Sequence, residues 1–253
     1  MSGPAYKDKL AYYASQAEWT ASLRGYLYRE IAIGTRHDAL DVGCGGGRLT
    51  AELAAKVRGR TVGCDVDPLA VAAARAAYPN LEFVACEPTR LPAADCSFDF
   101  VGCHFTLLWA HDPVALLVEM KRVTKPGGVV VALAEPDWGG FVEWPDFGLR
   151  DLMATALAAK DADPLAGRKL RDWFVRAGLT PREVGLTGGP WYATPASLDA
   201  TWAHHRWTLS GFVDERKLRV LERKARRAWE EGSRLVHLPL AWAIAEPGNA
   251  RAG

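Results

Sequence analysis

The sequence predicts an α/β fold built on a mostly parallel β-sheet. Between residues 38 and 136, short apolar runs alternate with helical patterns, which is typical of repeated β–α–β units. Each run is apolar enough to be buried on both faces, as strands of a parallel sheet are. Five strands are expected here: Ala39–Val42, Thr61–Cys64, Leu81–Val84, Phe98–Cys103 and Val129–Ala134.

Start and stop signals delimit the helices between these strands. Asp67-Pro68 is an N-cap followed by proline at the first helical position, so a helix is expected over Leu69–Ala77. Asp112-Pro113 repeats this pattern before Val114–Val123. Residues 125–128, Lys-Pro-Gly-Gly, then end that helix and lead the chain into the fifth strand.

The flanking regions have a different pattern. Residues 8–33 are expected to form one or two helices with overlapping apolar faces, and residues 137–149 form an irregular segment rich in Trp, Gly and Pro. Two late strands suggest a hairpin that closes one edge of the sheet. The later elements expected are helices Asp151–Lys160 and Gly167–Ala177, strand Arg182–Leu186, helices Pro195–His205 and Asp214–Trp229, and strand Val236–Ile244.

Composition excludes several classes of function. The 253 residues carry 31 Lys and Arg against 30 Asp and Glu, a balance that offers no field for gathering nucleic acid. There is no apolar run long enough to span a bilayer and no signal-peptide pattern, so a cytoplasmic protein is expected. The five cysteines lack metal-binding spacings, so no metal is expected. The oligomeric state stays open between monomer and homodimer.

A glycine-rich loop follows the first strand. Asp41, Gly43, Gly45 and Gly47 precede a helix, so backbone N–H groups are presented to a ligand with no side chains in the way. The dinucleotide-binding pattern would need glycine where Arg48 stands. A carboxylate at position 41 would also repel a pyrophosphate, whereas it suits a cationic amino and sulfonium group. The loop therefore favours S-adenosylmethionine over NAD.

A second acidic residue supports this interpretation independently. Asp65 ends the second strand 22 positions after Gly43, where its carboxylate can accept hydrogen bonds from both hydroxyls of a ribose. The alternatives are a glycine turn that only serves packing and an Asp65 that caps the next helix. Asp67 already fills the capping position.

The sequence resembles the class I S-adenosylmethionine-dependent methyltransferases, particularly the branch that includes the ubiquinone and menaquinone biosynthetic C-methyltransferases. The resemblance covers about residues 38–136 and rests on four segments together. It implies a Rossmann-like, seven-stranded and mostly parallel sheet with helices on both faces, and a final antiparallel strand inserted near the edge. The segments are Leu-Asp-Val-Gly-Cys-Gly-Gly-Gly (40–47), Gly-Cys-Asp-Val-Asp-Pro (63–68), Leu-Pro-Ala-Ala-Asp-Cys-Ser-Phe-Asp-Phe-Val (91–101) and Arg-Val-Thr-Lys-Pro-Gly-Gly (122–128).

On this resemblance the chain is one domain, 1–253. It is divided into an N-terminal helical lid (1–36), a cofactor-binding core (37–136), a small helical and aromatic cap with further insertions (137–235) and a closing strand (236–246).

The resemblance also implies roles for individual residues. The three loop glycines would run along the methionine part of the cofactor, Asp65 would bind the ribose and Val66 would pack on the adenine. Where the family usually has an aspartate for the adenine amino group, this sequence has Glu87 followed by Pro88, which removes a backbone N–H. The full set expected to bind the cofactor is Asp41, Gly43, Cys44, Gly45, Gly47, Asp65, Val66, Glu87, Pro88, Cys103 and His104.

Methyl transfer mainly needs a positioned nucleophile and exclusion of water, and only a weak nucleophile such as a phenol also needs a general base. His104 follows the fourth strand at the carboxyl edge of the sheet and is the best candidate for that base. The alternative is a histidine bonded to the methionine part of the cofactor or to a neighbouring helix. The segment lacks the Asn/Asp-Pro-Pro-Tyr/Phe and Pro-Cys patterns of enzymes that methylate DNA bases or protein amides.

Aromatic residues are frequent in the C-terminal third, where several of the ten tryptophans lie. They could line a lid over an apolar or aromatic acceptor, or they could be the core of the cap. Arg24 and Trp19 on the N-terminal helix could close over the cofactor carboxylate. The candidates for contact with the acceptor are His111, Glu135, Asp137, Trp138, Trp144 and Trp202.

We therefore predict an S-adenosylmethionine-dependent methyltransferase that acts on O, N or C of a small, apolar or aromatic molecule. Two alternatives remain at this stage. One is a methyltransferase fold that catalyses a non-methylating reaction such as a cyclisation, and the other is a non-catalytic pseudoenzyme.

Overall fold

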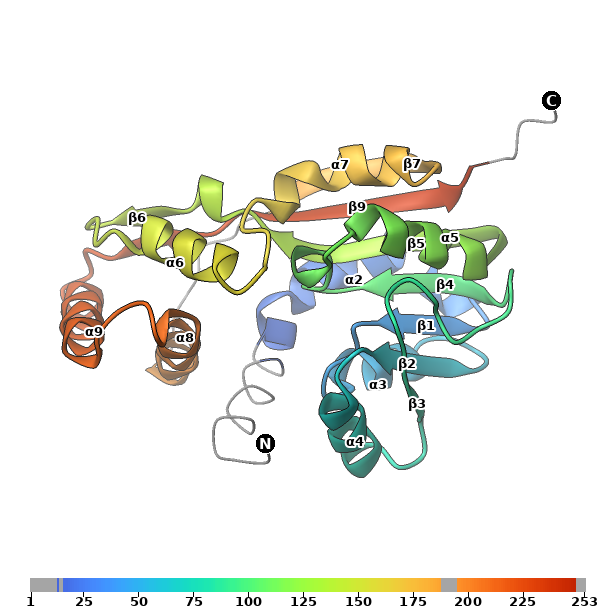
Figure 1. The fold of residues 1–253 in the computed structure, drawn as a ribbon, viewed down its shortest axis with the longest axis horizontal. Coiled ribbons are helices and arrows are strands. Elements are labelled where there is room, and N and C mark those ends of the chain that lie inside the picture. The colour runs from blue at the N-terminus through green and yellow to red at the C-terminus, as the bar shows by residue number, and fades with distance from the viewer. Residues whose placement is uncertain (1–12, 14–15, 188–194, 249–253) are drawn as a thin grey trace.

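The structure is a computed structural model that describes residue 13 and residues 16–187 and 195–248. Its main feature is a seven-stranded sheet, with a smaller cap beside it that carries its own two-stranded sheet (Figure 1). No helix among the described residues is long and apolar enough to cross a membrane. The strands of the large sheet are β1 (Ala39–Val42), β2 (Thr61–Asp65), β3 (Glu82–Ala85), β4 (Phe98–Cys103), β5 (Thr124–Pro136), β7 (Leu179–Thr187) and β9 (Leu240–Pro247).

The large sheet has the strand order β3-β2-β1-β4-β5-β9-β7. Strands β1 to β5 pair in parallel, whereas β9 runs antiparallel to both β5 and β7. The prediction of a seven-stranded, mostly parallel sheet is confirmed, and so is the antiparallel strand inserted next to the edge. The chain order reverses at β1 and β4, so the carboxyl ends of these two strands open a crevice where ligands of such sheets bind.

Helices cover both faces of this sheet because successive side chains of its strands point to opposite sides. Along β5, Val130 and Ala132 pack against α5 (Pro113–Val123) and α7 (Ala166–Arg176). The alternating residues Val129 and Val131 belong to the opposite core with α2 (Ala21–Glu30) and α3 (Arg48–Ala54). Helix α4 (Pro68–Ala77) packs beside β3 and β2.

The helix boundaries in the core follow the expected signals. The carboxylate of Asp67 accepts the N–H of Leu69 at the start of α4, and that of Asp112 accepts the N–H of Ala115 at the start of α5. In each helix, proline occupies the first position, where no intrahelical N–H bond would form in any case.

The N-terminal region contains a helical segment over residues 16–19, then α2 and the short 3₁₀ helix η1 (Ile33–Thr35). Leu27 and Ile31 lie in the core on the α3 side of the sheet. The predicted helices of residues 8–33 are therefore present from residue 16 onwards, and residues 8–12 lie outside the described part.

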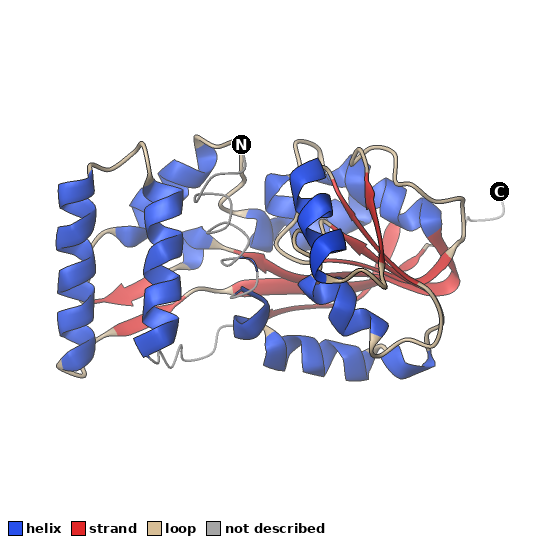
Figure 2. Ribbon diagram, turned by 90° about the horizontal axis from the view of Figure 1, so that it is seen from below, coloured by secondary structure: helices blue, strands red, loops and turns tan. Residues whose placement is uncertain are grey.

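The cap contains helices α6 (Leu149–Ala158), α8 (Pro195–Leu209) and α9 (Glu215–Glu230), which stand beside the large sheet (Figure 2). Its apolar core includes Met153, Leu157, Trp202 and Leu221 from these three helices. Helix α8 extends one turn beyond the predicted end at His205, and the aromatic pair Trp191 and Tyr192 lies outside the described residues.

Two sequence predictions in the cap are wrong. The segment 137–149 is not wholly irregular, because it forms the 3₁₀ helix η3 (Trp138–Gly140) and strand β6 (Val142–Trp144). The predicted last strand, Val236–Ile244, is in fact two strands. Strand β8 (Leu235–His237) pairs with β6 in the small sheet, and β9 begins after Pro239, which has no N–H to donate to a sheet.

Candidate cofactor and acceptor site

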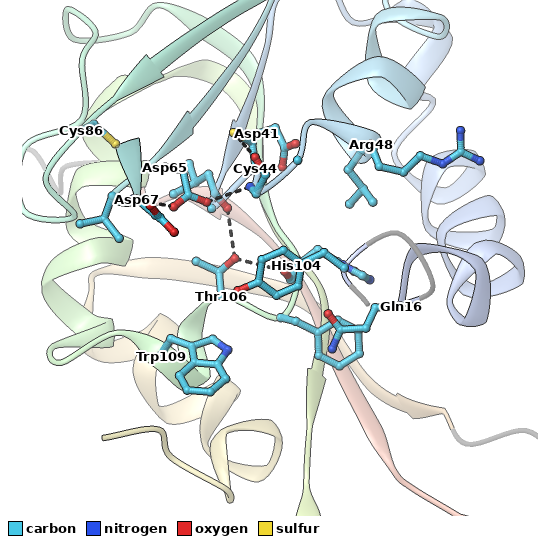
Figure 3. A pocket seen from close by; sticks show the side chains of 18 of the residues that line it. Gln16, Asp41, Cys44, Arg48, Asp65, Asp67, Cys86, His104, Thr106 and Trp109 are labelled. Carbon is cyan, nitrogen blue, oxygen red and sulfur yellow. Dashed lines mark hydrogen bonds between the residues drawn. The ribbon is translucent and has the colours of Figure 1, made fainter. Parts of the chain in front are cut away.

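A cavity of about 610 Å³ opens over the carboxyl ends of β1, β2 and β4. The acids Asp41 and Asp65 lie on one side of it, His104 and Thr106 lie at its centre, and Trp109 stands apart from the two acids (Figure 3). It is large enough for a nucleoside-sized ligand together with part of a second molecule. Its lining comes from the glycine loop, the ends of β2 and β3, the segment after β4, the N-terminal region and the cap.

The glycine loop is shaped for close approach to the backbone. Gly43, Gly45 and Gly47 have φ angles of +75°, +51° and +81°, in the left-handed region that glycine adopts without strain. A Cβ on Gly43 would stand 2.3 Å from the Oγ1 atom of Thr106, and one on Gly47 would meet the ring of Phe83 at 2.7 Å. The sequence therefore needs glycine at these positions both for backbone conformation and for space.

Asp65 fixes the loop and faces the same cavity. Its two carboxylate oxygens accept the backbone N–H groups of Gly45 (2.8 Å) and Asp67 (2.9 Å). Each ionised carboxylate oxygen can accept a second hydrogen bond, so the side chain can still take the hydroxyls of a ribose. The next residue, Val66, lines the cavity and is 58% exposed, which leaves its apolar surface available to a flat base.

Asp41 lies deeper, on β1, and is almost fully buried. The hydroxyl of Thr50 donates a 2.6 Å hydrogen bond to it. Burial raises the pKa of Asp41 to about 7 despite this bond, and the nearby charge of Asp65 adds to the shift. Near neutral pH the carboxyl group is therefore partly protonated, and a cationic group in the cavity would favour its ionised form.

At the end of the cavity where the adenine is expected, two predicted contact residues do not face the cavity. Cys86 and Pro88 line the cavity, but Glu87 is exposed and is not among the lining residues, because its backbone forms a bridge with Arg90 in a turn. Cys103 is fully buried inside β4 and does not reach the cavity. Glu87 and Cys103, which the sequence predicted as cofactor contacts, therefore do not face the cavity.

His104 lies at the junction of the cavity and the N-terminal region. Its Nε2 atom is 2.8 Å from the Oγ1 atom of Thr20, and its ring stands edge-on to Phe105. Burial lowers the pKa of His104 to about 3, and the charge of Arg24 adds to the shift. The neutral imidazole is then a poor proton acceptor, and its contact with Thr20 matches the alternative of a bond to a neighbouring helix.

Arg24 has a structural role that differs from the prediction. Its guanidinium group is buried, donates to the Oγ1 atom of Thr20 and to the carbonyl of Ala17, and forms a bidentate ion pair with Glu52 of α3. It is not among the residues that line the cavity. The ion pair therefore ties the N-terminal region to the core instead of binding a cofactor carboxylate.

Two of the acids expected to orient an acceptor hold the backbone instead. The buried carboxylate of Glu135 accepts the N–H groups of Thr106, Leu107 and Leu108, which shapes the 3₁₀ helix η2 (Leu107–Trp109). Burial raises the pKa of Glu135 to about 7. Asp137 accepts the N–H of Gly139 and pairs with the guanidinium of Arg168. Neither acid lines the cavities described here.

The other residues predicted to contact the acceptor lie in different surroundings. Trp138 lines a second, smaller cavity of about 60 Å³ between the sheet and the cap. Trp202 is buried in the cap core, whereas His111 and Trp144 are exposed and line neither cavity. Of the two N-terminal candidates, Trp19 lines the smaller cavity.

The two cavities are adjacent and share part of their walls. The smaller one is almost entirely apolar and aromatic, with contributions from η2, η3, α8 and β8. The residues common to both linings are Tyr13, Gln16, Phe105, Trp109 and Trp207.

Sequence reasoning missed several of these lining residues. Lys160 donates to the carbonyls of Trp207 and Thr208 at the end of α8, and its ammonium group lies over the Trp207 ring at 4.7 Å. Trp109 meets the same ring edge-on. The only sequence signal was the abundance of tryptophan, which does not tell lid from core.

Comparison with known proteins decides the family. A family described as a methyltransferase domain matches residues 40–132. The demethylmenaquinone methyltransferase of Beutenbergia cavernae is 36% identical over 176 residues, which cover 62% of this chain and 73% of that protein. The chain belongs to the class I S-adenosylmethionine-dependent methyltransferases. Within them this methyltransferase falls in the quinone C-methyltransferase-like branch, and the demethylmenaquinone methyltransferase of Shouchella clausii is also 33% identical over 63% of its length and 77% of that protein.

Solved structures share the fold of this methyltransferase at low sequence identity. The YcgJ protein of Bacillus subtilis superposes with a TM-score of 0.62 at 16% identity, covering 89% of this chain and 98% of that one. The geranyl diphosphate C-methyltransferase of Streptomyces coelicolor, solved with S-adenosyl-L-homocysteine, has a TM-score of 0.54 at 16% identity, with 83% and 72% covered. These similarities bear on the fold alone.

Proposed function

We propose that the larger cavity binds S-adenosylmethionine and that the smaller cavity binds the methyl acceptor. S-adenosylmethionine, when bound, supplies a methyl group already activated by its sulfonium. The cradle of Gly43, Gly45 and Gly47 excludes side chains from the ligand, Asp65 holds the ribose, and Val66 and Pro88 flank the adenine. Residues 37–136 then form the cofactor core, and η3, β6, α6, α8, α9 and β8 form the acceptor cap. The predicted cap boundaries of 137–235 are too wide, because β7 within them belongs to the large sheet and α7 packs against it.

The single observation that carries the acceptor assignment is the shared wall of the two cavities. Phe105, Trp109 and Trp207 face both spaces, so a molecule held in the cap would border the cofactor directly. The walls are apolar and aromatic, which suits a small apolar or aromatic acceptor. The near-neutral net charge of the chain supports a small molecule over nucleic acid, and its five free cysteines support action in the reducing cytoplasm.

The chemistry of the site favours an acceptor that needs no strong base from the protein. A reduced quinone has a ring carbon that is already electron-rich because of its two hydroxyls, so once it is positioned and water is excluded it can form a bond to the methyl group as the methyl–sulfur bond breaks. S-adenosylhomocysteine would leave, and the methylated ring carbon would lose its proton to solvent. Its flat ring also matches the aromatic walls. The relatives' names point to demethylmenaquinone, and we propose carbon methylation of a reduced quinone of this type.

The test is incubation of the protein with S-adenosylmethionine and a reduced, short-chain demethylmenaquinone. Mass spectrometry is expected to show a quinone heavier by one methyl group, together with S-adenosylhomocysteine. Quinone turnover without a methyl gain would favour the non-methylating alternative, and no turnover would reject this acceptor class.

Replacing His104 by asparagine tests whether this histidine is a base. Because burial holds its pKa at about 3, we expect kcat to fall by less than about 10-fold, which is below the usual contribution of a general base. The pH dependence of kcat between pH 6 and 9 is expected to keep its shape. A loss of about 1000-fold with a missing basic limb would show that His104 removes a proton.

The raised pKa of Asp41 leads us to expect that cofactor binding depends on pH. The pKa is raised to about 7, so the carboxyl group is mostly neutral at pH 5.5 and mostly ionised at pH 7.5, and only the ionised form attracts the cationic cofactor. We expect binding of S-adenosylmethionine, measured by calorimetry, to strengthen by about 5-fold or more over this range. In Asp41→Asn the dependence should flatten, and an equally steep curve in the variant would assign the titration elsewhere.

A further inference from the structure

The smaller cavity contains one polar side chain with an unsatisfied buried atom. His205, on α8, is 7% exposed and lines the cavity beside the aromatic residues. Its ring stands edge-on to Trp202, with 5.1 Å between ring centroids, and faces Trp138 at 6.5 Å. The Nδ1 atom of His205 has no hydrogen-bond partner. Buried polar atoms are nearly always paired, so this unpaired nitrogen, on a residue that lines a cavity, is available for a hydrogen bond to a bound molecule.

The neighbouring histidine shows that the unpaired nitrogen is specific to His205. His204 is equally buried, but its ring nitrogens lie 3.3 and 3.4 Å from the hydroxyl of Thr208, one turn further along α8. The ring of His204 also stacks on Trp207. The cavity therefore has one histidine held by its own helix and another whose Nδ1 is left for a second molecule.

The surroundings determine the chemistry that His205 can recognise. The ring of His204 lies 5.7 Å from that of His205, measured between centroids. Burial is the main reason why the pKa of His205 falls to about 3, and the charge of Arg234 adds to the shift. The ring is therefore neutral at physiological pH, with one nitrogen that donates and one that accepts. A neutral ring in an aromatic cavity suits an uncharged hydroxyl or carbonyl, whereas none of the described residues that line this cavity is a lysine or arginine that could pair with an anionic group.

We propose that the imidazole of His205 is the polar anchor of the acceptor site and forms a hydrogen bond with a hydroxyl or carbonyl oxygen on a flat aromatic acceptor. This inference rests on the proposed function, in which the acceptor occupies the cap cavity. It adds a specific protein partner, the imidazole of His205, for an uncharged oxygen on the acceptor ring. His205 is then a specificity-determining residue that orients the ring against the aromatic wall.

A matched pair of probes tests this anchor without knowledge of the natural acceptor. The protein is saturated with S-adenosylhomocysteine, and binding of 2-naphthol and of naphthalene is measured by equilibrium dialysis. The two compounds share a ring system and differ by one hydroxyl. The wild-type protein is expected to bind 2-naphthol about 10-fold more tightly, and His205→Phe, which keeps a flat ring without nitrogens, is expected to abolish this preference.

The control variant is His237→Phe, which makes the same change on β8 at a half-buried residue outside both linings. It should keep the preference. If His205→Phe retains the 10-fold preference, or if the wild-type protein shows none, the proposal that His205 binds the acceptor oxygen is wrong. The proposal that the cap cavity binds the acceptor is not affected by that result. If neither probe binds the loaded wild-type protein, the acceptor assignment fails together with the anchor.

A second measurement on the wild-type protein covers the case in which His205→Phe does not fold. With ¹⁵N-labelled histidine, NMR reports the ring nitrogens directly. Addition of 2-naphthol is expected to shift the ring signals of His205, and naphthalene is expected to leave the nitrogen shifts nearly unchanged. Equal shifts with both probes would contradict a hydrogen bond to the hydroxyl.

Discussion

Replacing Gly43 by alanine is expected to weaken binding of S-adenosylhomocysteine by about 100-fold or more, as measured by isothermal titration calorimetry. The residue has a φ angle of +75°, which costs an alanine on the order of 1–2 kcal/mol. In addition, the new Cβ would stand 2.3 Å from the Oγ1 atom of Thr106, which itself donates a hydrogen bond to the carbonyl of Val42. The loop or the segment after β4 must move, and either movement deforms the cofactor cradle.

Replacing a second glycine that has the same backbone conformation separates the cost of backbone strain from the loss of cofactor affinity. Gly127 has a φ angle of +76°, and a Cβ there would meet nothing within 4 Å. Gly127→Ala is expected to cost a similar amount of stability, measured by thermal unfolding, without a change in cofactor affinity. Equal affinities for Gly43→Ala and the wild-type protein would show that the ligand does not approach this loop.

Replacing Asp65 by alanine has the second largest expected effect. The carboxylate would lose two charge-assisted bonds to the ribose, and the N–H groups of Gly45 and Asp67 would lose their acceptor. Affinity for both S-adenosylmethionine and S-adenosylhomocysteine is expected to fall by about 100-fold or more, since two bonds to a charged group contribute roughly 1.5–3 kcal/mol each.

Two further variants make the Asp65 result specific. Asp65→Asn keeps an acceptor for one of the two N–H groups and should fall between wild type and Asp65→Ala. Asp214→Ala removes the exposed N-cap of α9, a helix that contributes to neither cavity lining, so it should lower stability by about 1 kcal/mol and leave the affinity unchanged. If Asp65→Ala bound both compounds as tightly as the wild-type protein, the ribose would have to be held by another residue.

The core of the fold and the cofactor loop could be predicted from the sequence because their signals are local. Each strand of residues 38–136 is a short apolar run, and Asp-Pro pairs mark the starts of α4 and α5 within a few residues. The glycines at 43, 45 and 47 also indicated a turn with positive φ angles, because glycine adopts such angles without strain. The two strands closing the sheet were found too, although the division at Pro239 was missed.

The partners of buried polar groups could not be predicted because they come from distant parts of the chain. Glu135 follows the fifth strand like a site residue, yet it binds N–H groups about 28 positions earlier. The Nε2 atom of His104 contacts the Oγ1 atom of Thr20, which lies 84 positions earlier in the chain. The ring of His104 is buried there, and this burial lowers the pKa of the histidine. A residue at the carboxyl edge of a sheet can face a ligand or hold a loop, and only the three-dimensional contacts decide which.

The cap was the least predictable region because aromatic residues serve equally well as core and as cavity wall. Trp202 and Trp138 look alike in the sequence and both are buried in the cap core, but only Trp138 also lines the smaller cavity. The pairing of β6 with β8 joins segments about 90 residues apart, and each strand has only three residues. Strands this short carry little periodicity.

The central claim is that the cavity over the glycine loop binds the methyl donor. Calorimetric titration of the wild-type protein with S-adenosylhomocysteine tests it most directly, since the product needs no acceptor to bind. We predict one site per chain with a dissociation constant in the range of about 1–100 µM. No binding at about 1 mM, which corresponds to a binding free energy weaker than about −4 kcal/mol, would contradict the assignment.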